Sequence, residues 1–313
     1  MSPNIVPDAL AGLRIDVVLA EMMPEFSRTQ LTTWLKEGKI TLDNKVRKPK
    51  EKVYGGESIQ TSFTVEPVRL NIDIAENIPL DIVYEDEHLL IINKQAGLVV
   101  HPGAGNHQHT LVNALLYHSR ELASLPRAGI VHRLDKDTTG LLIVAKTLIC
   151  KTQLIRQLEA REINRHYIAL VQGHIIAGAE IETLYGRHPR NRLKMAVREE
   201  GKLAITRYTL KKQYQDFTLL NVQLLTGRTH QIRVHLAHIR HPLVGDTLYG
   251  LRLRFPKEAS DTVKEVLHDF KRQALHACSL HFVHPITKEP ITVEAPLPAD
   301  FQHLLNCLDN KDS

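Results

Sequence analysis

The chain has 313 residues, of which 43% are hydrophobic and 24% are charged. This composition is typical of a globular protein with a substantial core, and it excludes an intrinsically disordered chain. Lysine and arginine (40) outnumber aspartate and glutamate (35), which gives a formal net charge of +5. The positive balance suits a polyanionic partner without identifying one.

Length and residue usage also bear on organisation and compartment. A chain of this size exceeds what one hydrophobic core usually supports, so we expect two domains. Three widely separated cysteines predict neither a disulfide framework nor a thiolate metal site. The first residues lack the pattern of a secretory signal, and no apolar run approaches the roughly 20 residues of a membrane span. We therefore expect a cytoplasmic protein with no membrane partner.

The N-terminal part predicts two short helices followed by a β-hairpin. Ile15 and Leu19 recur at helical spacing, and a second helix is expected to end at Gly38. Residues 40–46 then have the pattern of a hairpin with a tight turn at 43–44.

This hairpin region is strongly basic. Residues 36–52 contain seven lysines and arginines against three acids. A solvated face is the common explanation of such a run, and a phosphate-binding surface is the alternative. The candidate RNA-contacting residues here are Lys36, Lys39, Lys45, Arg47 and Lys48.

The remainder of the chain predicts a mixed α+β domain after a proline-containing linker at 64–79. The expected elements are two strands within 83–94 joined by an acidic turn, a helix over 147–162, strands at 167–171, 204–210, 217–225 and 232–236, and a helix over 263–270. Without regular βαβ alternation, a doubly wound parallel sheet is not expected. The glycine-rich segment 97–105 lacks the lysine and spacing of a phosphate-binding loop, so no nucleotide cofactor is predicted.

The most informative segment runs from His132 to Gly140 and reads HRLDKDTTG. Asp135 lies between Arg133 and Lys136, directly before an apolar run that predicts a buried strand. Flanking cations favour the ionised carboxylate, which is the form needed for a nucleophile or a base. An ion-paired aspartate at a strand edge is nevertheless structural more often than catalytic.

Two further motifs follow in order. Residues 164–171 read NRHYIALV, and residues 225–236 read LTGRTHQIRVHL. Together with HRLDKDTTG, they closely resemble the motifs of the RluA family of RNA pseudouridine synthases. The resemblance implies that Asp135 is the essential catalytic residue, that Tyr167 is the active-site tyrosine, and that Arg228 pairs with Asp135 to orient it and keep it ionised.

The family resemblance also implies a fold and a division of the chain. It predicts the pseudouridine synthase fold, a mixed and largely antiparallel sheet with flanking helices, over residues 76–313. The basic helix-to-hairpin arrangement of the N-terminal part resembles a small αL-type RNA-binding domain of a ribosomal protein, which commonly precedes pseudouridine synthase domains, and we assign residues 13–75 to it. The reaction needs neither redox nor phosphate chemistry, so no cofactor is expected.

A second basic segment bears on the substrate. Residues 186–202 contain six basic residues and two acids between predicted strands, an arrangement suited to holding a phosphate backbone, with a solvated loop as the alternative. The candidates in this segment are Arg187, Arg190, Arg192 and Lys194. Arg133 is assigned either to support of Asp135 or to a phosphate.

Histidines close in sequence raise the possibility of a metal site. His230, His235 and His238 follow one another closely, but no HExxH or CxxC pattern accompanies them, and neighbouring arginines would repel a cation. We therefore predict no metal site.

Within the family, residues 101–118, 186–197 and 241–250 are most similar to members that modify large-subunit (23S) ribosomal RNA in the helix 69 stem-loop. The alternatives are a member that acts at other uridines of the same RNA, a non-catalytic RNA-binding assembly factor, and an aspartate-based glycosidase with Asp137 as its second carboxylate. The expected partner is ribosomal RNA, free or in the large subunit or its precursor, and the expected state is a monomer.

Overall fold

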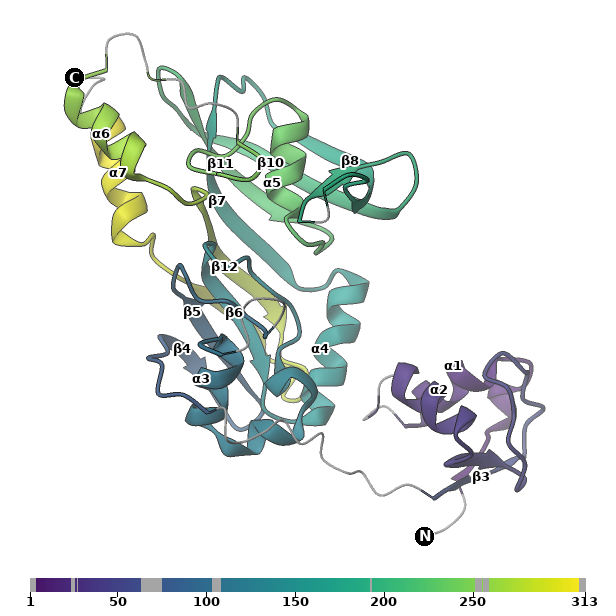
Figure 1. Cartoon of the computed structure of the whole chain (residues 1–313). Helices are drawn as coiled ribbons and strands as arrows, with labels where there is room; N and C mark the ends of the chain where they lie inside the picture. Colours follow the sequence, from purple (N-terminus) through teal and green to yellow (C-terminus); the bar gives the residue numbers. More distant parts are fainter. Residues whose placement is uncertain are drawn as a thin grey trace.

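The structure is a computed structural model that describes residues 4–23, 26, 28–62, 75–102, 108–191, 193–250, 255 and 259–309. A small N-terminal unit carries a three-stranded sheet, and a larger unit carries a ten-stranded sheet. Figure 1 shows the N-terminal unit (purple) standing beside the end of the larger unit that contains helix α4 (Leu148–Ala160). The predicted linker lies mostly outside the described residues, and the division at residues 75 and 76 stays a prediction.

The N-terminal unit confirms the two predicted helices and the tight turn at 43–44, but the hairpin predicted within 40–46 is reduced to an isolated bridge between Leu42 and Lys45, because the strand 40–42 pairs with residues 58–61 instead. Its elements are β1 (Asn4–Ile5), the 3-10 helix η1 (Asp8–Leu10), α1 (Ile15–Met22), α2 (Arg28–Lys36), β2 (Ile40–Leu42) and β3 (Ser58–Thr61). Asp43 and Asn44 both have positive φ, +48° and +59°, between the bridged residues Leu42 and Lys45. Asp and Asn tolerate this conformation better than other non-glycine residues, which explains the tight turn.

The larger unit is built on an almost entirely antiparallel sheet. Its strands are β4 (Ile82–Glu85), β5 (Leu89–Lys94), β6 (Thr139–Ala145), β7 (Asn164–Gln172), β8 (Ala179–Arg187), β9 (Met195–Val197), β10 (Lys202–Gln213), β11 (Phe217–Leu224), β12 (Leu275–Val283) and β13 (Pro290–Glu294). The order across the sheet is β4-β5-β6-β12-β7-β11-β10-β8-β9, with β13 paired to β12. The strands predicted within 83–94 and at 167–171, 204–210 and 217–225 are confirmed.

Strand β12 joins two halves of the sheet and pairs in parallel with β6 (Figure 1). At this junction Gly140 has φ +109°, and a Cβ atom there would lie 2.2 Å from the carbonyl oxygen of Ala277. Only glycine permits both this conformation and this approach. The close contact between β6 and β12 therefore explains why the HRLDKDTTG motif ends in glycine, at Gly140.

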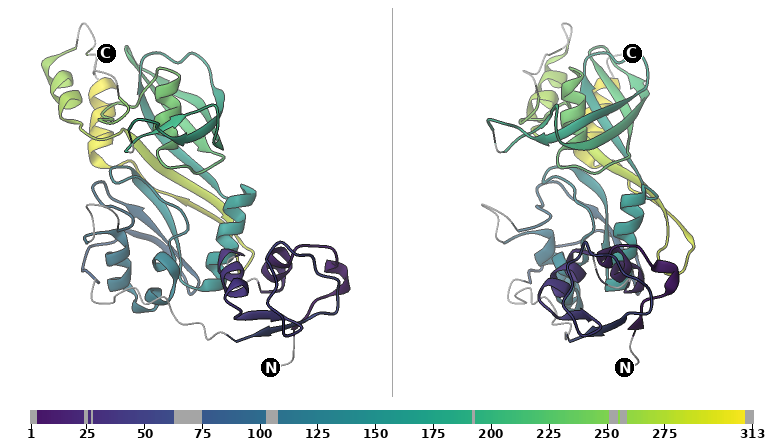
Figure 2. Two further views of the ribbon diagram at one scale, coloured as in Figure 1. Left: turned by 45° about the vertical axis from the view of Figure 1, so that its right-hand side comes forward. Right: turned by 90° about the vertical axis from the view of Figure 1, so that its right-hand side faces the viewer.

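Helices flank the sheet at several places, as the two views of Figure 2 show. The larger unit contains α3 (Leu111–His118), the 3-10 helices η3 (Arg120–Ser124) and η4 (Pro126–Gly129), α4, α5 (Gln231–His238), α6 (Asp261–Asp269) and α7 (Ala299–Asp309). The predicted helices at 147–162 and 263–270 are confirmed as α4 and α6, whereas α3 and α7 were not predicted. Within the described residues, no helix is long and apolar enough to span a bilayer.

The strand predicted at 232–236 is wrong, because these residues belong to helix α5. The alternation of Ile232, Val234 and Leu236 suggested a strand with one buried face. In the structure the intervening Arg233 and His235 are buried as well. Because every side of this turn of helix is enclosed, the apolar positions carry no useful periodicity.

His235 connects α5 to the sheet through contacts with threonines of β8 and β10. Its side chain is fully buried, with Nδ1 2.9 Å from Oγ1 of Thr206 and Nε2 3.0 Å from Oγ1 of Thr183. Burial, with a smaller effect of His238, lowers the pKa of His235 from 6.5 to about 4. The folded state therefore favours the neutral imidazole.

We predict that the free energy of unfolding decreases as the pH falls from 6.5 toward 4, partly through His235. In this range the unfolded chain binds a proton that the folded chain excludes, so acid favours unfolding. His235→Gln should show a shallower loss between pH 7 and pH 5 in urea titrations, because glutamine does not titrate. An equally steep loss in both proteins would contradict this assignment.

Candidate active site

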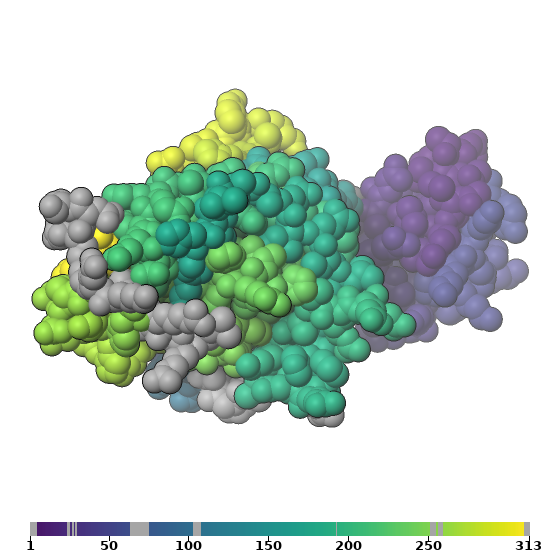
Figure 3. All heavy atoms as spheres, turned by 90° about the horizontal axis from the view of Figure 1, so that it is seen from above, coloured from purple at the N-terminus to yellow at the C-terminus, as the bar shows by residue number. Residues whose placement is uncertain are grey.

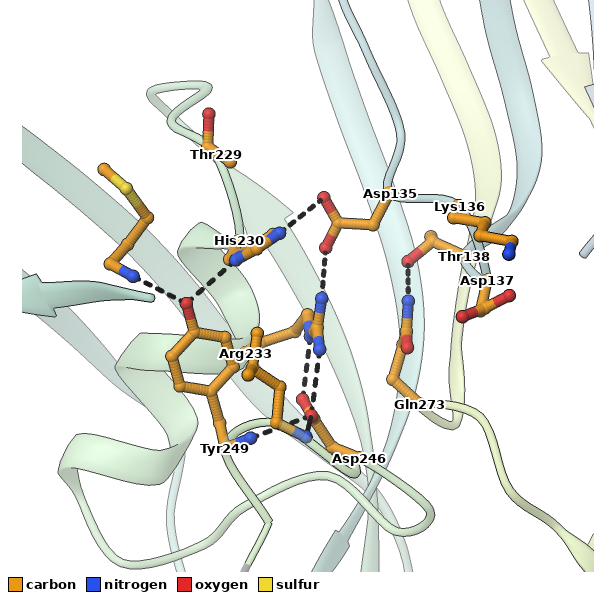
Figure 4. Close-up of polar contacts among 12 residues, drawn as sticks. Asp135, Lys136, Asp137, Thr138, Thr229, His230, Arg233, Asp246, Tyr249 and Gln273 are labelled. Atoms are coloured by element: carbon orange, nitrogen blue, oxygen red, sulfur yellow. Dashed lines mark hydrogen bonds and ion pairs between the residues drawn. The ribbon is translucent and has the colours of Figure 1, made fainter. Parts of the chain in front are cut away.

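Asp135 lies in the turn that enters β6, as the sequence predicted. The backbone N–H of Thr138 donates to the carbonyl of Asp135 at 3.1 Å and closes the turn. Nε2 of the buried Gln273, just before β12, donates to Oγ1 of Thr138 at 2.9 Å (Figure 4). The Asp135 carboxylate is thereby held at the junction between the two halves of the sheet, with its side chain 13% exposed.

The charge partner of Asp135 is Arg233 of helix α5. Nη1 of Arg233 lies 3.0 Å from Oδ2 of Asp135. The same guanidinium donates from Nε and Nη2 to the two carboxylate oxygens of Asp246, at 2.8 and 2.9 Å (Figure 4). One buried arginine therefore links two carboxylates, one facing the cleft and one enclosed.

Asp246 is the enclosed anchor of this group. Its carboxylate also accepts the backbone N–H groups of Leu248 and Tyr249, at 2.9 and 3.0 Å. Burial alone would raise the pKa of Asp246, but the hydrogen bonds and charge of Arg233 hold it below its usual value. Burial would likewise lower the pKa of Arg233, and the two carboxylates instead raise it. Both groups stay ionised at neutral pH.

Tyr249 and His230 complete the surroundings of Asp135. The Tyr249 ring covers Arg233, with 5.1 Å from Cζ to the ring centroid, and its hydroxyl accepts the N–H of Met195 at 2.7 Å. The hydroxyl lies 2.8 Å from Nδ1 of His230, whose Nε2 is 3.8 Å from Oδ1 of Asp135. Burial lowers the pKa of His230, although the charge of Asp135 opposes this effect. The Tyr249 hydroxyl, which accepts from Met195, donates a hydrogen bond to Nδ1 of a neutral His230, and the ring proton on Nε2 then faces Asp135.

The predicted pairing of Arg228 with Asp135 is wrong, because the arginine that pairs with Asp135 is Arg233. In the described structure no ion pair joins Arg228 to Asp135, and Nε of Arg228 donates to the carbonyl of Leu203 at 3.3 Å. The cause lies in Gln231, whose side-chain oxygen accepts the N–H of Arg228 at 3.0 Å and fixes the loop before α5. Arg228 therefore lines the cleft, whereas Arg233, in the first turn of the helix, contacts Asp135.

Tyr167 lies on β7 and lines the same depression as Asp135 and Arg228. Its side chain is 4% exposed, and burial raises the pKa of its phenol to about 12. The structure therefore brings the three predicted catalytic residues to one place, with Tyr167 as a protonated phenol in the floor. Their catalytic roles stay predictions.

A strongly cationic cleft adjoins this depression. It has a volume of about 990 Å³ and extends between β7, the loop before α5 and the end of α4. Among the described lining residues, Glu159 is the one acid beside its arginines. The arginines that line it are Arg127, Arg133, Arg161, Arg165 and Arg228. This excess of positive charge suits a phosphate backbone.

The other candidate RNA-contacting residues occupy two further surfaces. In the N-terminal unit Lys36, Lys39, Lys45 and Lys48 are exposed and Arg47 is half-buried beside Glu51. In the larger unit Arg187 and Arg190 are exposed on the β8–β9 hairpin, and Nζ of Lys194 lies 5.8 Å from the Tyr249 ring centroid. Arg192 lies outside the described residues. Figure 3 shows the N-terminal unit (purple) at one side of the larger unit, so these basic surfaces are separate.

Two of the three histidines considered as metal ligands have other partners. His230 contacts Tyr249 and His235 contacts two threonines. No group of three or more histidine, cysteine or acidic side chains arranged to hold a metal ion occurs within the described ranges.

Sequence reasoning missed Arg233, Asp246 and the buried Arg165. Arg233 stands five residues after Arg228 in one motif, and nothing in the spacing distinguishes the two until the helix is known. Asp246 lies in the segment 241–250, where the sequence offers only a resemblance to relatives. The sequence shows only that Arg233 and Asp246 lie in separate segments. That they are buried and paired can be seen only once the fold is known.

We predict that Asp246→Asn lowers the free energy of unfolding by about 3–5 kcal/mol, because it leaves the buried guanidinium of Arg233 short of a counter-charge. The matched control is Asp300→Asn, which removes a half-exposed carboxylate from Arg272. The control should cost about 1 kcal/mol or less. Urea unfolding of both variants tests this. Equal losses of unfolding free energy would refute the claim that Asp246 is a buried counter-charge needed by Arg233.

Two family models match the chain. Residues 88–238 match the family model described as RNA pseudouridylate synthase, and residues 13–59 match the S4 domain model. The chain is 51% identical to the ribosomal large subunit pseudouridine synthase D of Xanthomonas campestris pv. campestris, over 97% of this chain and 91% of that protein. It is 50% identical to the protein of the same name from Haemophilus influenzae, over 98% of this chain and 94% of that protein.

Two solved human structures have a similar fold. RNA Pseudouridylate Synthase Domain Containing 1 matches with a TM-score of 0.56 and 26% identity, over 73% of this chain and 87% of that chain. RNA Pseudouridylate Synthase Domain Containing 4 matches with a TM-score of 0.56 and 25% identity, over 73% and 92%. The expected fold, with an S4 domain before a mixed sheet flanked by helices, is confirmed. The chain belongs to the RNA pseudouridylate synthase family.

Proposed function

We propose that this RNA pseudouridine synthase isomerises uridines in the 23S RNA of the large ribosomal subunit, in the helix 69 stem-loop, with Asp135 as the reacting carboxylate. The observation that supports it most is the carboxylate of Asp135, held by Arg233 beside Tyr167 at the edge of an arginine-lined cleft. The names of the relatives support the large-subunit substrate. The similarity of residues 101–118, 186–197 and 241–250 to enzymes of helix 69 supports the finer assignment.

The reaction moves a glycosidic bond within one nucleotide. The bond from ribose C1′ to uracil N1 breaks, the uracil turns over, and C1′ bonds to C5, which loses its proton while N1 gains one. Electrons are conserved within the nucleotide, so no oxidant or reductant takes part. The target uridine must first leave its stack, at a cost of a few kcal/mol that is smallest in a loop.

Asp135 can start this sequence in either of two ways. Its carboxylate can attack C1′ and form a covalent intermediate, or it can remove a ribose proton so that a glycal forms. Both routes need an ionised and oriented carboxylate. Arg233 supplies the orientation through Nη1, and its own position is fixed by Asp246.

In this proposal Tyr167 receives the extruded uracil by stacking. An aromatic face against a base contributes about 1 to 3 kcal/mol. Because burial raises the pKa of the phenol to about 12, Tyr167 carries no negative charge that would repel Asp135 or the RNA.

The S4 unit supplies a second contact with RNA in this proposal. Exposed lysines beside the β2–β3 sheet face solvent and can meet phosphates, which position RNA without reading its sequence. We place the enzyme in the cytoplasm as a monomer whose substrate is the ribosomal RNA, free or in the large subunit or its precursor.

We predict that Asp135→Asn abolishes pseudouridine formation on a 23S stem-loop RNA while RNA affinity changes little, because only the reacting charge is lost. Asp137→Asn is the control, since it removes a neighbouring carboxylate from the same loop and should keep activity. Chemical mapping of pseudouridine after incubation measures both. Turnover by Asp135→Asn would refute the role of Asp135, and release of free uracil by the wild type would favour a glycosidase.

We also predict that Lys45→Gln/Lys48→Gln weakens RNA binding but spares the single-turnover rate at saturating RNA. Removal of each lysine–phosphate interaction should lower the slope of log affinity against log salt by about 0.7 to 0.9. Lys264→Gln/Lys271→Gln changes the net charge equally in and beside α6, at the far end of the molecule from the S4 unit (Figure 1). An equal decrease of slope in both double variants would show a general charge effect and no binding surface.

A further inference from the structure

Arg165 is a buried arginine without a counter-charge. It lies at the start of β7 with 6% of its surface exposed, and it lines the cationic cleft. Its Nε has no hydrogen-bond partner, and no carboxylate forms an ion pair with it within the part of the chain that the structure describes. Arg233, by contrast, is similarly buried and contacts two carboxylates.

Such an arrangement is costly for the folded protein alone. A buried ionised group loses its hydration, and proteins ordinarily compensate with a counter-charge or hydrogen bonds. Burial lowers the pKa of Arg165, because loss of hydration disfavours the charged guanidinium. A buried charged group that lines a cleft and lacks a partner is explained when a ligand supplies the missing acceptor.

The loop before α5 lies close against the Arg165 guanidinium. A Cβ atom on Gly227 would lie 2.7 Å from its Nη1. The loop before α5 therefore closes over the guanidinium, and glycine at position 227 is what lets it do so. The guanidinium is a planar fork of N–H donors, which matches two oxygens of a phosphate.

The position of Arg165 relates the missing acceptor to the reacting nucleotide. Arg165 and Tyr167 are two residues apart on one strand, so both side chains project from the same face, about 6.6 to 6.8 Å apart along it. The cleft around them is lined by Arg133 and Arg228. His132, also in the cleft, is neutral because burial and the charge of Arg165 lower its pKa to about 3. The surroundings of Arg165 thus favour an anion.

We propose that Arg165 binds a backbone phosphate of the RNA next to the uridine held at Asp135 and Tyr167. This inference rests on the proposed function, since it requires that the nucleotide at Asp135 be part of an RNA strand. The phosphate replaces the missing counter-charge and fixes the strand at one point. Rotation of the target nucleotide into the depression then occurs about a fixed backbone.

The test compares Arg165→Met with Arg161→Gln in the full chain, using a 23S stem-loop RNA that the wild type converts to pseudouridine. Arg161 lines the same cleft but is exposed at the end of α4, so its removal changes the local field without removing the buried contact. Arg165→Met should raise Kd about 10- to 100-fold, as expected for a hydrogen-bonded charged contact. It should also lower the salt slope by about 0.7 to 0.9. Arg161→Gln should raise Kd only a few-fold.

Stability separates a binding role from a structural one. Arg165→Met should leave the urea midpoint unchanged or raise it, because an apolar chain replaces an uncompensated buried charge. A lower midpoint with unchanged Kd would make Arg165 structural and overturn the proposal. A higher Kd with an unchanged salt slope would assign Arg165 to the uracil instead of a phosphate, which also overturns it.

Gly227→Ala provides an independent variant that keeps the charge. The added methyl group displaces the guanidinium, so Kd should rise in the wild-type background and change no further in the Arg165→Met background. Additive effects of the two substitutions would contradict the proposal. If the wild type does not convert the RNA, the proposed function fails; if it converts the RNA and Arg165→Met binds equally well, only the phosphate contact fails.

Discussion

The guanidinium of Arg233 is the contact on which the site depends. Asp135 and Arg233 are 98 residues apart in sequence, and Asp246 follows Arg233 by 13. Bonding to Asp246 through two nitrogens fixes the plane of the guanidinium and leaves Nη1 for Asp135. Because the partners are buried, the pair is weakly screened by salt and already arranged before substrate binds.

The sheet brings these three segments together at the junction formed by β12. Asp135 enters from the half that contains β6, whereas Tyr167 and Arg233 come from the half that contains β7 and α5. Gly140 lets β6 pass close to β12, and Gln273 ties the Asp135 turn to the start of the same strand. A change at this junction should therefore alter the position of the carboxylate relative to its arginine, even without contact with RNA.

The sequence predicted most local structure and much less of the contacts between segments. Turn chemistry at 43–44 and the fully apolar strand after Asp135 were readable because neighbouring residues determine them. Helix α5 has the alternation typical of a strand because burial on all sides removes helical periodicity. The motif around Arg228 contained the correct partner, Arg233, but the choice between them depends on how Gln231 fixes the preceding loop. Arg165 was missed because its burial and lack of a partner are properties of the folded chain.

The central claim is that Arg233, held by Asp246, orients Asp135, while Arg228 does not. The most direct measurement is the single-turnover rate of pseudouridine formation at saturating RNA in Arg233→Lys and Arg228→Lys, which keep the net charge. A lysine at 233 cannot contact both carboxylates with a planar fork, so the account predicts a loss of about a hundredfold or more, as for a misplaced reacting group. Arg228→Lys should stay within a few-fold of the wild type. A near-normal rate for Arg233→Lys, with the large loss in Arg228→Lys, would contradict the account.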